Sequence, residues 1–141
     1  MGYPAATCAG IMTTNAGLIP YTVRIMTIDP PLTIETLQGN SPGTVVLHLN
    51  GSITMNTVAP LRALFRDAEP PSHLILDFSD VAYMDSAGMS EIISHEVYCR
   101  EKGVLMTLAG VHSRVLSMLK ITRLDKVLTL AANVEEAEAR E

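Results

Sequence analysis

Short stretches of apolar residues, either alternating with polar ones or running together, predict the β-strands of this chain. Residues 32–37 alternate in the manner of a half-buried strand. The sequence Gln-Gly-Asn-Ser-Pro-Gly at 38–43 is a strong turn signal, so 44–49 predicts a second strand antiparallel to the first. Further strands are predicted at 73–78, which is typical of a buried central strand, at 104–108 and at 127–130.

Apolar residues three and four positions apart predict a helix after the second strand. Asn56 or Thr57 is suited to cap this helix, and Pro60 falls in its first turn, where proline is tolerated. The Glu-Pro-Pro sequence at 69–71 ends it. The apolar stripe of this helix consists of Val58, Leu61, Leu64, Phe65 and Ala68.

A second helix is predicted from Ser86 to Lys102, with Gly103 as its C-cap. A third helix opens at Ser113. Asn133 caps a fourth helix over 134–141, whose first turn carries two glutamates at the positive end of the helix dipole. The predicted inner face of the second helix carries Met89, Ile92, Ile93 and Val97.

Strands that alternate with helices of this length favour βαβ crossovers and a largely parallel sheet. With the initial hairpin, the predicted fold class is α/β, with a mixed but mostly parallel sheet of four to five strands and about four helices. The domain is expected over 31–141. Residues 1–30 are interpreted as an N-terminal extension, either partly ordered or not native, since Met12 and Met26 are each a potential start.

Charge and cysteine content narrow the class of protein. The chain carries 10 Lys and Arg against 15 Asp and Glu, a net charge of −5, which argues against nucleic acid or an anionic membrane as the main partner. Cys8 and Cys99 form no C-x-x-C pattern, and the first basic residue is Arg24, so neither a metal framework nor a secretory signal is indicated. No stretch reaches the length of a membrane span, and a cytoplasmic location is expected.

The loop that leads from the buried strand at 73–78 to the second helix carries the candidate chemistry. It brings Asp80 and Asp85 close in sequence to Ser86, at a helix start where the backbone N–H groups are suited to bind a phosphate. Phosphorylation of Ser86 would add about −1.5 to −2 charges beside the two aspartates without unfolding the domain. The same Asp-Ser pair can also serve as a helix cap and nothing more.

The segment 73–89, HLILDFSDVAYMDSAGM, resembles the signature of the STAS family (sulfate transporter and anti-sigma factor antagonist). In that family a buried strand leads to a loop that reads roughly Asp-Ser-small-Gly-Leu. The resemblance extends over about 32–135 and is of the anti-sigma factor antagonist type. It includes a strand ending in glycine at 45–51, the next strand at 102–109 and the following helix at 115–119.

The resemblance implies that Ser86 is a phosphorylation site. The unphosphorylated protein is then expected to bind an anti-sigma factor that is also a serine kinase, to leave it on phosphorylation, and to be reset by a PP2C-type phosphatase. The ATP and Mg²⁺ belong to the kinase, so the resemblance implies a non-enzymatic monomer or weak dimer without a cofactor. The residues implied in partner binding are Gly51, Thr54, Asp80, Met84, Asp85, Ala87, Gly88 and Met89.

Two positions depart from the family pattern. Thr54 stands where the family often has an acidic residue, and Thr122-Arg123-Leu124 replaces a stretch with a common glycine, which we expect to affect loop geometry only. Thr54 keeps other functions open: a STAS subunit that docks on a lipid-transport ABC system without phosphorylation, or a stressosome-like scaffold. His48, in a predicted strand, is expected to be a core-edge side chain and not a metal ligand.

Overall fold

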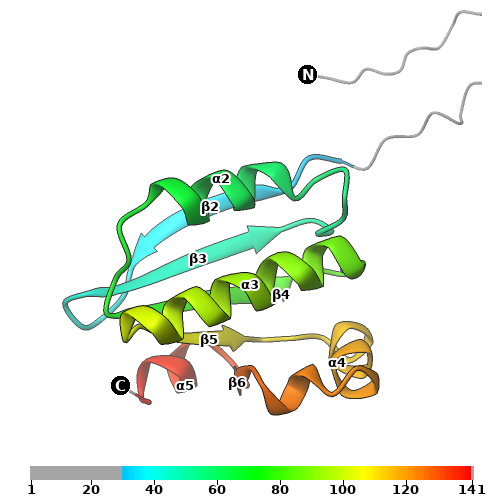
Figure 1. The fold of residues 1–141 in the computed structure, drawn as a ribbon. Coiled ribbons are helices and arrows are strands. Elements are labelled where there is room, and N and C mark those ends of the chain that lie inside the picture. Colours follow the sequence, from blue (N-terminus) through cyan, green and yellow to red (C-terminus); the bar gives the residue numbers. More distant parts are fainter. Residues whose placement is uncertain (1–29, 141) are drawn as a thin grey trace, which may run out of the picture. The chain divides into compact units, whose positions relative to one another are not determined.

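The five strands of the sheet follow one another in space in the same order as in the chain. A computed structural model describes residues 30–140. The sheet order is β2-β3-β4-β5-β6, with β2 antiparallel to β3 and every later pair parallel, as Figure 1 shows. The strands are β2 (Thr33–Gln38), β3 (Thr44–Asn50), β4 (His73–Asp80), β5 (Leu105–Ala109) and β6 (Thr129–Ala131). The predicted α/β class with a mixed, mostly parallel sheet is confirmed.

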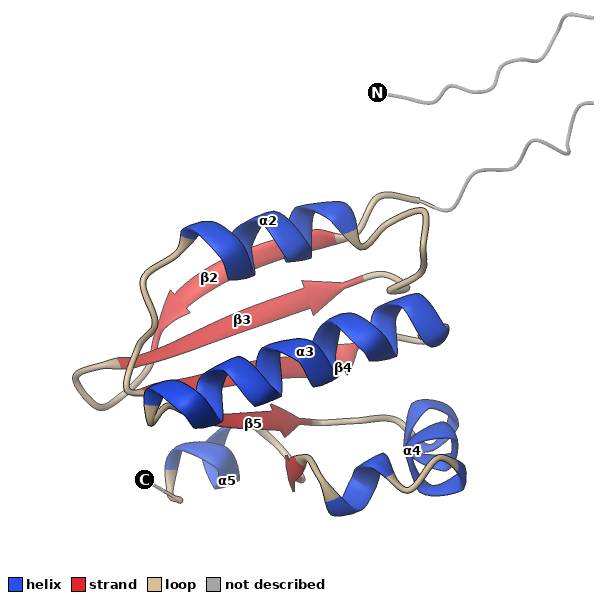
Figure 2. Ribbon diagram, viewed as in Figure 1, coloured by secondary structure: helices blue, strands red, loops and turns tan. Residues whose placement is uncertain are grey.

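The helices cover the two faces of the sheet unequally. The main core contains buried side chains from α2 (Ala59–Asp67), α3 (Ser86–Lys102) and α4 (Ser113–Ile121), which pack against one face. Figure 2 shows α2 and α3 lying across that face. Within the described residues, the other face holds a small cluster of mostly short side chains beneath a single helix, α5 (Val134–Glu138). A 3₁₀ helix, η2 (Leu124–Lys126), precedes β6.

Helix α2 begins differently from the prediction. Its N-cap is Val58, which makes no side-chain cap hydrogen bond. The predicted cap Thr57 is engaged in the preceding loop, where its hydroxyl donates to the Ser52 carbonyl at 2.7 Å. The helix starts only after this turn is complete, and Pro60 is tolerated there because the first-turn N–H groups have no partner within the helix.

The buried face of α3 also corrects the prediction. Val97 is 50% exposed, whereas Glu96 and Cys99 are buried with Ile92. Residues four and seven positions after Ile92 lie on the same side of an α-helix as Ile92, and these are Glu96 and Cys99. Val97, five positions after Ile92, lies on another side. Glu96 is tolerated there because Arg100, one turn later, pairs with its carboxylate and also donates to the Val127 carbonyl at 2.6 Å.

The end of the domain is tied back to its first hairpin. Asn133 caps α5 by accepting a hydrogen bond from the Glu136 N–H at 2.8 Å, as predicted, although the described helix ends at Glu138 and not at residue 141. Glu138 in turn accepts from the Asn40 side chain at 2.9 Å, in the turn between β2 and β3. The last predicted strand is found two residues later, at Thr129–Ala131, because η2 takes up the preceding residues.

Arg123 adopts a backbone conformation that favours glycine. It follows the Thr122 C-cap of α4 with φ of 66°, and it is the one non-glycine residue with positive φ among residues 30–140. This is the position after a helix where a left-handed residue, usually glycine, accepts the reversal of the chain. The loop therefore keeps a glycine-like geometry and carries the strain in the arginine.

We expect Arg123→Gly to raise the free energy of unfolding by about 1 kcal/mol, because glycine removes the left-handed penalty of a side chain. The matched control is Lys120→Gly at an exposed position inside α4. Because glycine is unfavourable within a helix, this variant should lower the free energy of unfolding by about 1 kcal/mol. Urea unfolding of both variants would check this. A loss of stability in Arg123→Gly would show that arginine contacts outweigh the backbone strain.

Candidate functional site at the start of helix α3

Two loops lie side by side at the carboxyl ends of β3 and β4. Residues 51–58 connect β3 to α2, and residues 81–85 connect β4 to α3. Backbone hydrogen bonds join them: the Gly51 N–H donates to the Asp80 carbonyl at 3.1 Å and the Ile53 N–H donates to the Tyr83 carbonyl at 3.0 Å. Ligands and partners of open α/β sheets commonly bind at this edge, so the pair of loops is the candidate site.

The Asp85 carboxylate organises both loops. It is the N-cap of α3, and its Oδ1 accepts from the N–H groups of Ala87 at 2.9 Å and Gly88 at 3.0 Å. Its Oδ2 accepts from the Met55 N–H in the other loop at 3.1 Å. The helix N-terminus carries partial positive charge, so the aspartate charge is stabilised where it lies. The start of α3 and the 51–58 loop are thereby held as one unit.

Ser86 is the first residue of α3 and is exposed. Its position agrees with the prediction, but the expected phosphate cradle is partly occupied. The Ala87 and Gly88 N–H groups already bind Asp85, so a phosphate on Ser86 would lie beside that carboxylate instead of replacing it at those groups. The arrangement therefore favours repulsion at the surface over an internal phosphate contact.

Gly88 and Met84 lie inside the domain. A Cβ atom on Gly88 would come within 2.5 Å of the Ile53 carbonyl oxygen, so only glycine allows α3 to approach the 51–58 loop this closely. The Met84 side chain has no exposed area. Both were named as partner-binding residues, but they set the position of the loop and offer no side-chain surface to a partner.

Thr54 is also buried, at 7% exposure. Its hydroxyl accepts from the Asn56 N–H at 3.2 Å, and its carbonyl accepts from the N–H groups of Thr57 and Val58. This local turn uses the hydroxyl where an acidic side chain is common in the family the sequence resembles. Thr54 therefore shapes the loop, and its side chain adds no charge to the site.

The surface of the site consists of fewer residues than predicted. Ser86 and Asp80 are exposed, whereas Gly51, Asp85, Ala87 and Met89 are partly buried. Met55 was missed by sequence reasoning, yet it is 74% exposed on the loop that Asp85 holds. Helix and strand periodicity does not apply to a loop residue, so the sequence carries no signal for the exposure of Met55.

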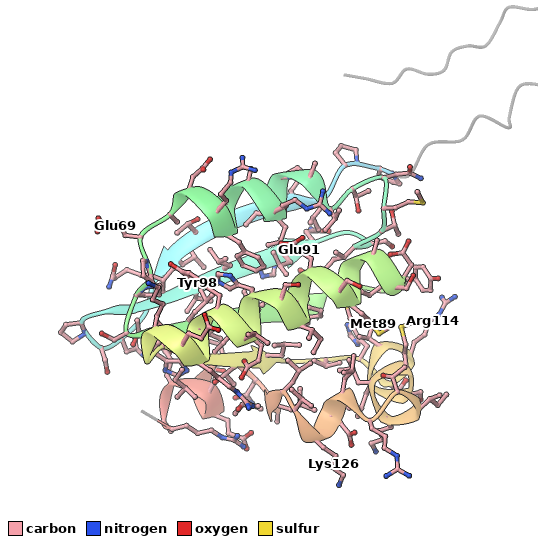
Figure 3. All side chains as sticks on the ribbon, in the orientation of Figure 1. Glu69, Met89, Glu91, Tyr98, Arg114 and Lys126 are labelled. Atoms are coloured by element: carbon pink, nitrogen blue, oxygen red, sulfur yellow. The ribbon has the colours of Figure 1, made fainter. Side chains whose placement is uncertain are left out.

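Charged and aromatic side chains surround this surface. Figure 3 shows Met89 near the start of α3 and Glu91 directed toward α2, where the Arg62 Nε donates to it at 2.9 Å. The Arg114 guanidinium lies over the Tyr83 ring, 5.1 Å from its centroid. Arg62 and Arg114 therefore each contact an acidic or aromatic neighbour.

A second feature missed by sequence reasoning lies beside the site. His48 contacts two carboxylates, with its Nδ1 2.9 Å from Asp77 Oδ2 and its Nε2 2.9 Å from Asp80 Oδ2. The hydrogen bond with Asp77 raises the pKa of His48 above its usual 6.5, against the effect of burial, and Asp80 adds to the rise. The pKa of Asp77 is lowered because hydrogen bonds from His48 and Ser79 outweigh its burial.

Other chemistry is not indicated within residues 30–140. In this range no group of three or more His, Cys, Asp and Glu side chains is placed to hold a metal ion. Among the described helices none is both long and apolar enough to cross a membrane. Burial raises the pKa of the Cys99 thiol to about 11, which keeps it in the unreactive protonated form.

Comparison with known protein families matches residues 34–137 to the STAS domain. This chain belongs to the STAS domain family. The match covers both loops of the candidate site and places the Asp85-Ser86 pair within the domain.

Solved structures of STAS proteins share the fold. A sulfate transporter family protein from Wolinella succinogenes is 20% identical with a TM-score of 0.66, over 73% of this chain and 88% of that one. An anti-sigma factor antagonist from Mycobacterium paratuberculosis is 22% identical with a TM-score of 0.61, over 77% and 92%. The Bacillus cell fate determinant SpoIIAA, in its phosphorylated form, is 19% identical with a TM-score of 0.59, over 77% and 98%.

Gly88→Ala should destabilise this STAS domain by about 1–3 kcal/mol, because the added methyl group meets a backbone oxygen that cannot move away cheaply. Chemical unfolding would measure the change. Ser90→Ala, an exposed position two residues further along α3, is the control and should change stability by less than about 0.5 kcal/mol. Equal stability of Gly88→Ala and wild type would contradict the close packing.

Asp85→Ala should lower the free energy of unfolding by about 1–2 kcal/mol, since it removes the N-cap of α3. It should also increase hydrogen exchange at the Met55 amide, whose acceptor lies on Asp85. Asp125→Ala, an aspartate in η2 away from both loops, is the control and should leave the Met55 amide unchanged. If Asp85→Ala leaves Met55 exchange unchanged, Asp85 does not join the two loops.

Proposed function

We propose that this STAS domain is an anti-sigma factor antagonist whose binding surface is switched off by phosphorylation of Ser86. The observation that carries the proposal is the placement of the Ser86 side chain. It is exposed, and it directly follows an aspartate whose carboxylate is already fixed by backbone N–H groups of the first turn of α3 and of the 51–58 loop. A kinase can reach this hydroxyl without opening the domain.

Charge at Ser86 would change the surface and leave the fold in place. A phosphate adds about −1.5 to −2 charges near neutral pH. The helix N-terminus already balances Asp85, and Arg62 and Arg114 are engaged with Glu91 and Tyr83. The added charge would lie beside the Asp85 carboxylate, where it would repel an acidic partner surface and would be costly to bury against an apolar one.

The known relatives support this proposal. One structural neighbour is an anti-sigma factor antagonist, and SpoIIAA has been solved with the same fold in a phosphorylated form. By analogy, the unmodified domain binds an anti-sigma factor that is also a serine kinase, and a PP2C-type phosphatase restores Ser86. The domain acts as a cytoplasmic binding switch, monomeric or weakly dimeric, and performs no catalysis itself.

A second function is kept because of Thr54. The buried Thr54 hydroxyl serves its own turn, so the loop lacks the acidic side chain that often accompanies the phosphorylated serine in such antagonists. This favours a STAS subunit that docks on a lipid-transport ABC system, or a stressosome-like scaffold, in which the same surface binds a partner without phosphorylation.

The test uses the purified chain as bait in lysate of its own organism, as wild type, Ser86→Ala and Ser86→Asp. Ser113→Asp is the matched control, because Ser113 is also an exposed serine at the first position of a helix. Captured proteins are identified by mass spectrometry. We expect wild type, Ser86→Ala and Ser113→Asp to retain an ATPase-type serine kinase and Ser86→Asp to lose it.

Retention of the same partner by all four forms would show that charge at Ser86 is not a switch. Retention of a transporter ATPase by all four would favour the docking subunit instead. Incubation of the captured kinase with ATP should add phosphate to wild type and none to Ser86→Ala, as measured by peptide mass spectrometry.

A further inference from the structure

His48 holds two aspartates on the face of the sheet opposite the main core. Val46 and Ile75 on that face pack under α5, but His48 and Asp77, their neighbours two residues further along β3 and β4, lie beyond that cluster. The imidazole ring bridges Asp77 and Asp80, with both nitrogen–oxygen distances at 2.9 Å. The side chain is 25% exposed, so it can exchange protons with solvent.

The geometry of this bridge requires the protonated ring. A neutral imidazole has one N–H donor and one acceptor nitrogen, whereas the imidazolium has two donors. Because a carboxylate oxygen lies at hydrogen-bond distance from each nitrogen, only the imidazolium satisfies both contacts. Loss of the proton would leave one carboxylate facing a nitrogen lone pair.

A bulge in β4 brings the second aspartate into reach. His48 is paired with Asp77 and Asn50 with Asp80, so one residue between these pairs on β3 faces two residues on β4. In a regular strand Asp77 and Asp80 would point to opposite faces. The extra residue turns Asp80 toward His48, which is the known effect of a bulge on the direction of a side chain.

The bulge directly precedes residues 81–85, the loop that leads to Ser86 and is called the Ser86 loop below. The Asp80 carbonyl accepts from the Gly51 N–H, which is the first of the backbone contacts that join the two loops. The next contacts are Ile53 to Tyr83 and Asp85 to Ile53, the latter at 3.1 Å, and they lead to the start of α3. A change in the position of Asp80 would therefore shift the first of these contacts and the loops that follow it.

We propose that His48 is a proton-operated positioning residue: with its ring protonated it clamps Asp77 and Asp80 and fixes the Ser86 loop, and with its ring neutral it releases Asp80 and loosens that loop. The meaning of this clamp for partner exchange rests on the proposed function. The clamp itself does not depend on any partner.

The sign of the pH response follows from the two pKa directions. Since the pKa of His48 is raised on folding, its contribution to stability is complete below about 6.5 and is lost as pH rises through the higher folded value. The pKa of Asp77 is lowered, so its contribution is present above about 3.8 and is lost as pH falls through the folded value. The clamp is therefore strongest between about pH 3.8 and about pH 6.5.

Two other titratable groups lie near this cluster, and their effects on a pH titration must be distinguished from that of His48. Glu35 on β2 is paired with His48 across the antiparallel ladder and is exposed. His112, just before α4, contacts the Ser79 carbonyl inside the bulge through its Nε2. His112→Gln therefore serves as the matched control, because it removes the other histidine that touches the bulge.

The experiment is an NMR titration of the full chain between about pH 5 and pH 9, across the range where histidine changes charge. In wild type we expect the His48 ring to titrate with a midpoint above 6.5 and the Gly51 and Gly88 amide signals to follow the same midpoint. In Asp80→Asn the His48 midpoint should fall, and the two amides should lose that transition. His112→Gln should retain both the raised His48 midpoint and the matching transition of the two amides.

A His48 midpoint at or below 6.5, or amides that do not follow it, would overturn the clamp. His48→Gln gives a second measurement, because glutamine keeps a donor but does not titrate in this range. Its stability should lack the fall that wild type shows as pH rises past neutrality, and an unchanged fall would also contradict the proposal.

Failure of the proposed function is distinguishable from failure of the clamp. If Ser86→Asp retains every partner, the proposed switch at Ser86 is wrong, but the expected titration of His48 and of the two amides stays the same. Where the serine kinase is captured as proposed, its retention by wild type should weaken as pH rises through the His48 midpoint, and its retention by His48→Gln should not follow that midpoint.

Discussion

One carboxylate holds the candidate site together. Asp85 accepts three backbone hydrogen bonds, two from the first turn of α3 and one from the loop before α2, so two segments about 30 positions apart share a single anchor. The close approach of α3 that this requires depends on Gly88, where no side chain fits. Ser86 is thereby exposed at the start of a helix whose first turn is fixed by Asp85.

The unequal covering of the sheet explains where a second polar feature can lie. On the face covered by α2, α3 and α4, the buried side chains form the main apolar core, and the buried Glu96 is paired with Arg100. On the other face α5 is the one helix of residues 30–140 that packs, and the ends of β3 and β4 carry His48 and Asp77. Charged groups are tolerated there because solvent reaches them and each finds a partner.

Periodicity was sufficient for the elements and their order, because strand and helix repeats are local properties. It was insufficient where a side chain from elsewhere decided the outcome. The cap of α2 moved to Val58 because Thr57 serves the loop, and a glutamate occupies the inward position 96 because Arg100 pairs with it. His48 could not be linked to Asp77 and Asp80 from sequence, since that contact depends on strand register and on a bulge.

The strand order has a consequence for how the chain assembles. Because each strand of β2 to β6 pairs with the one before it, every strand can join an existing edge as soon as it leaves the ribosome. Each parallel pair must first close a crossover, since Val46 pairs with Ile75 and Ile75 with Thr107, and such long-range pairing is associated with slower folding than local contacts. The contact between Asn40 and Glu138 spans 98 positions, so we expect the first hairpin to wait for the last helix before its turn is locked.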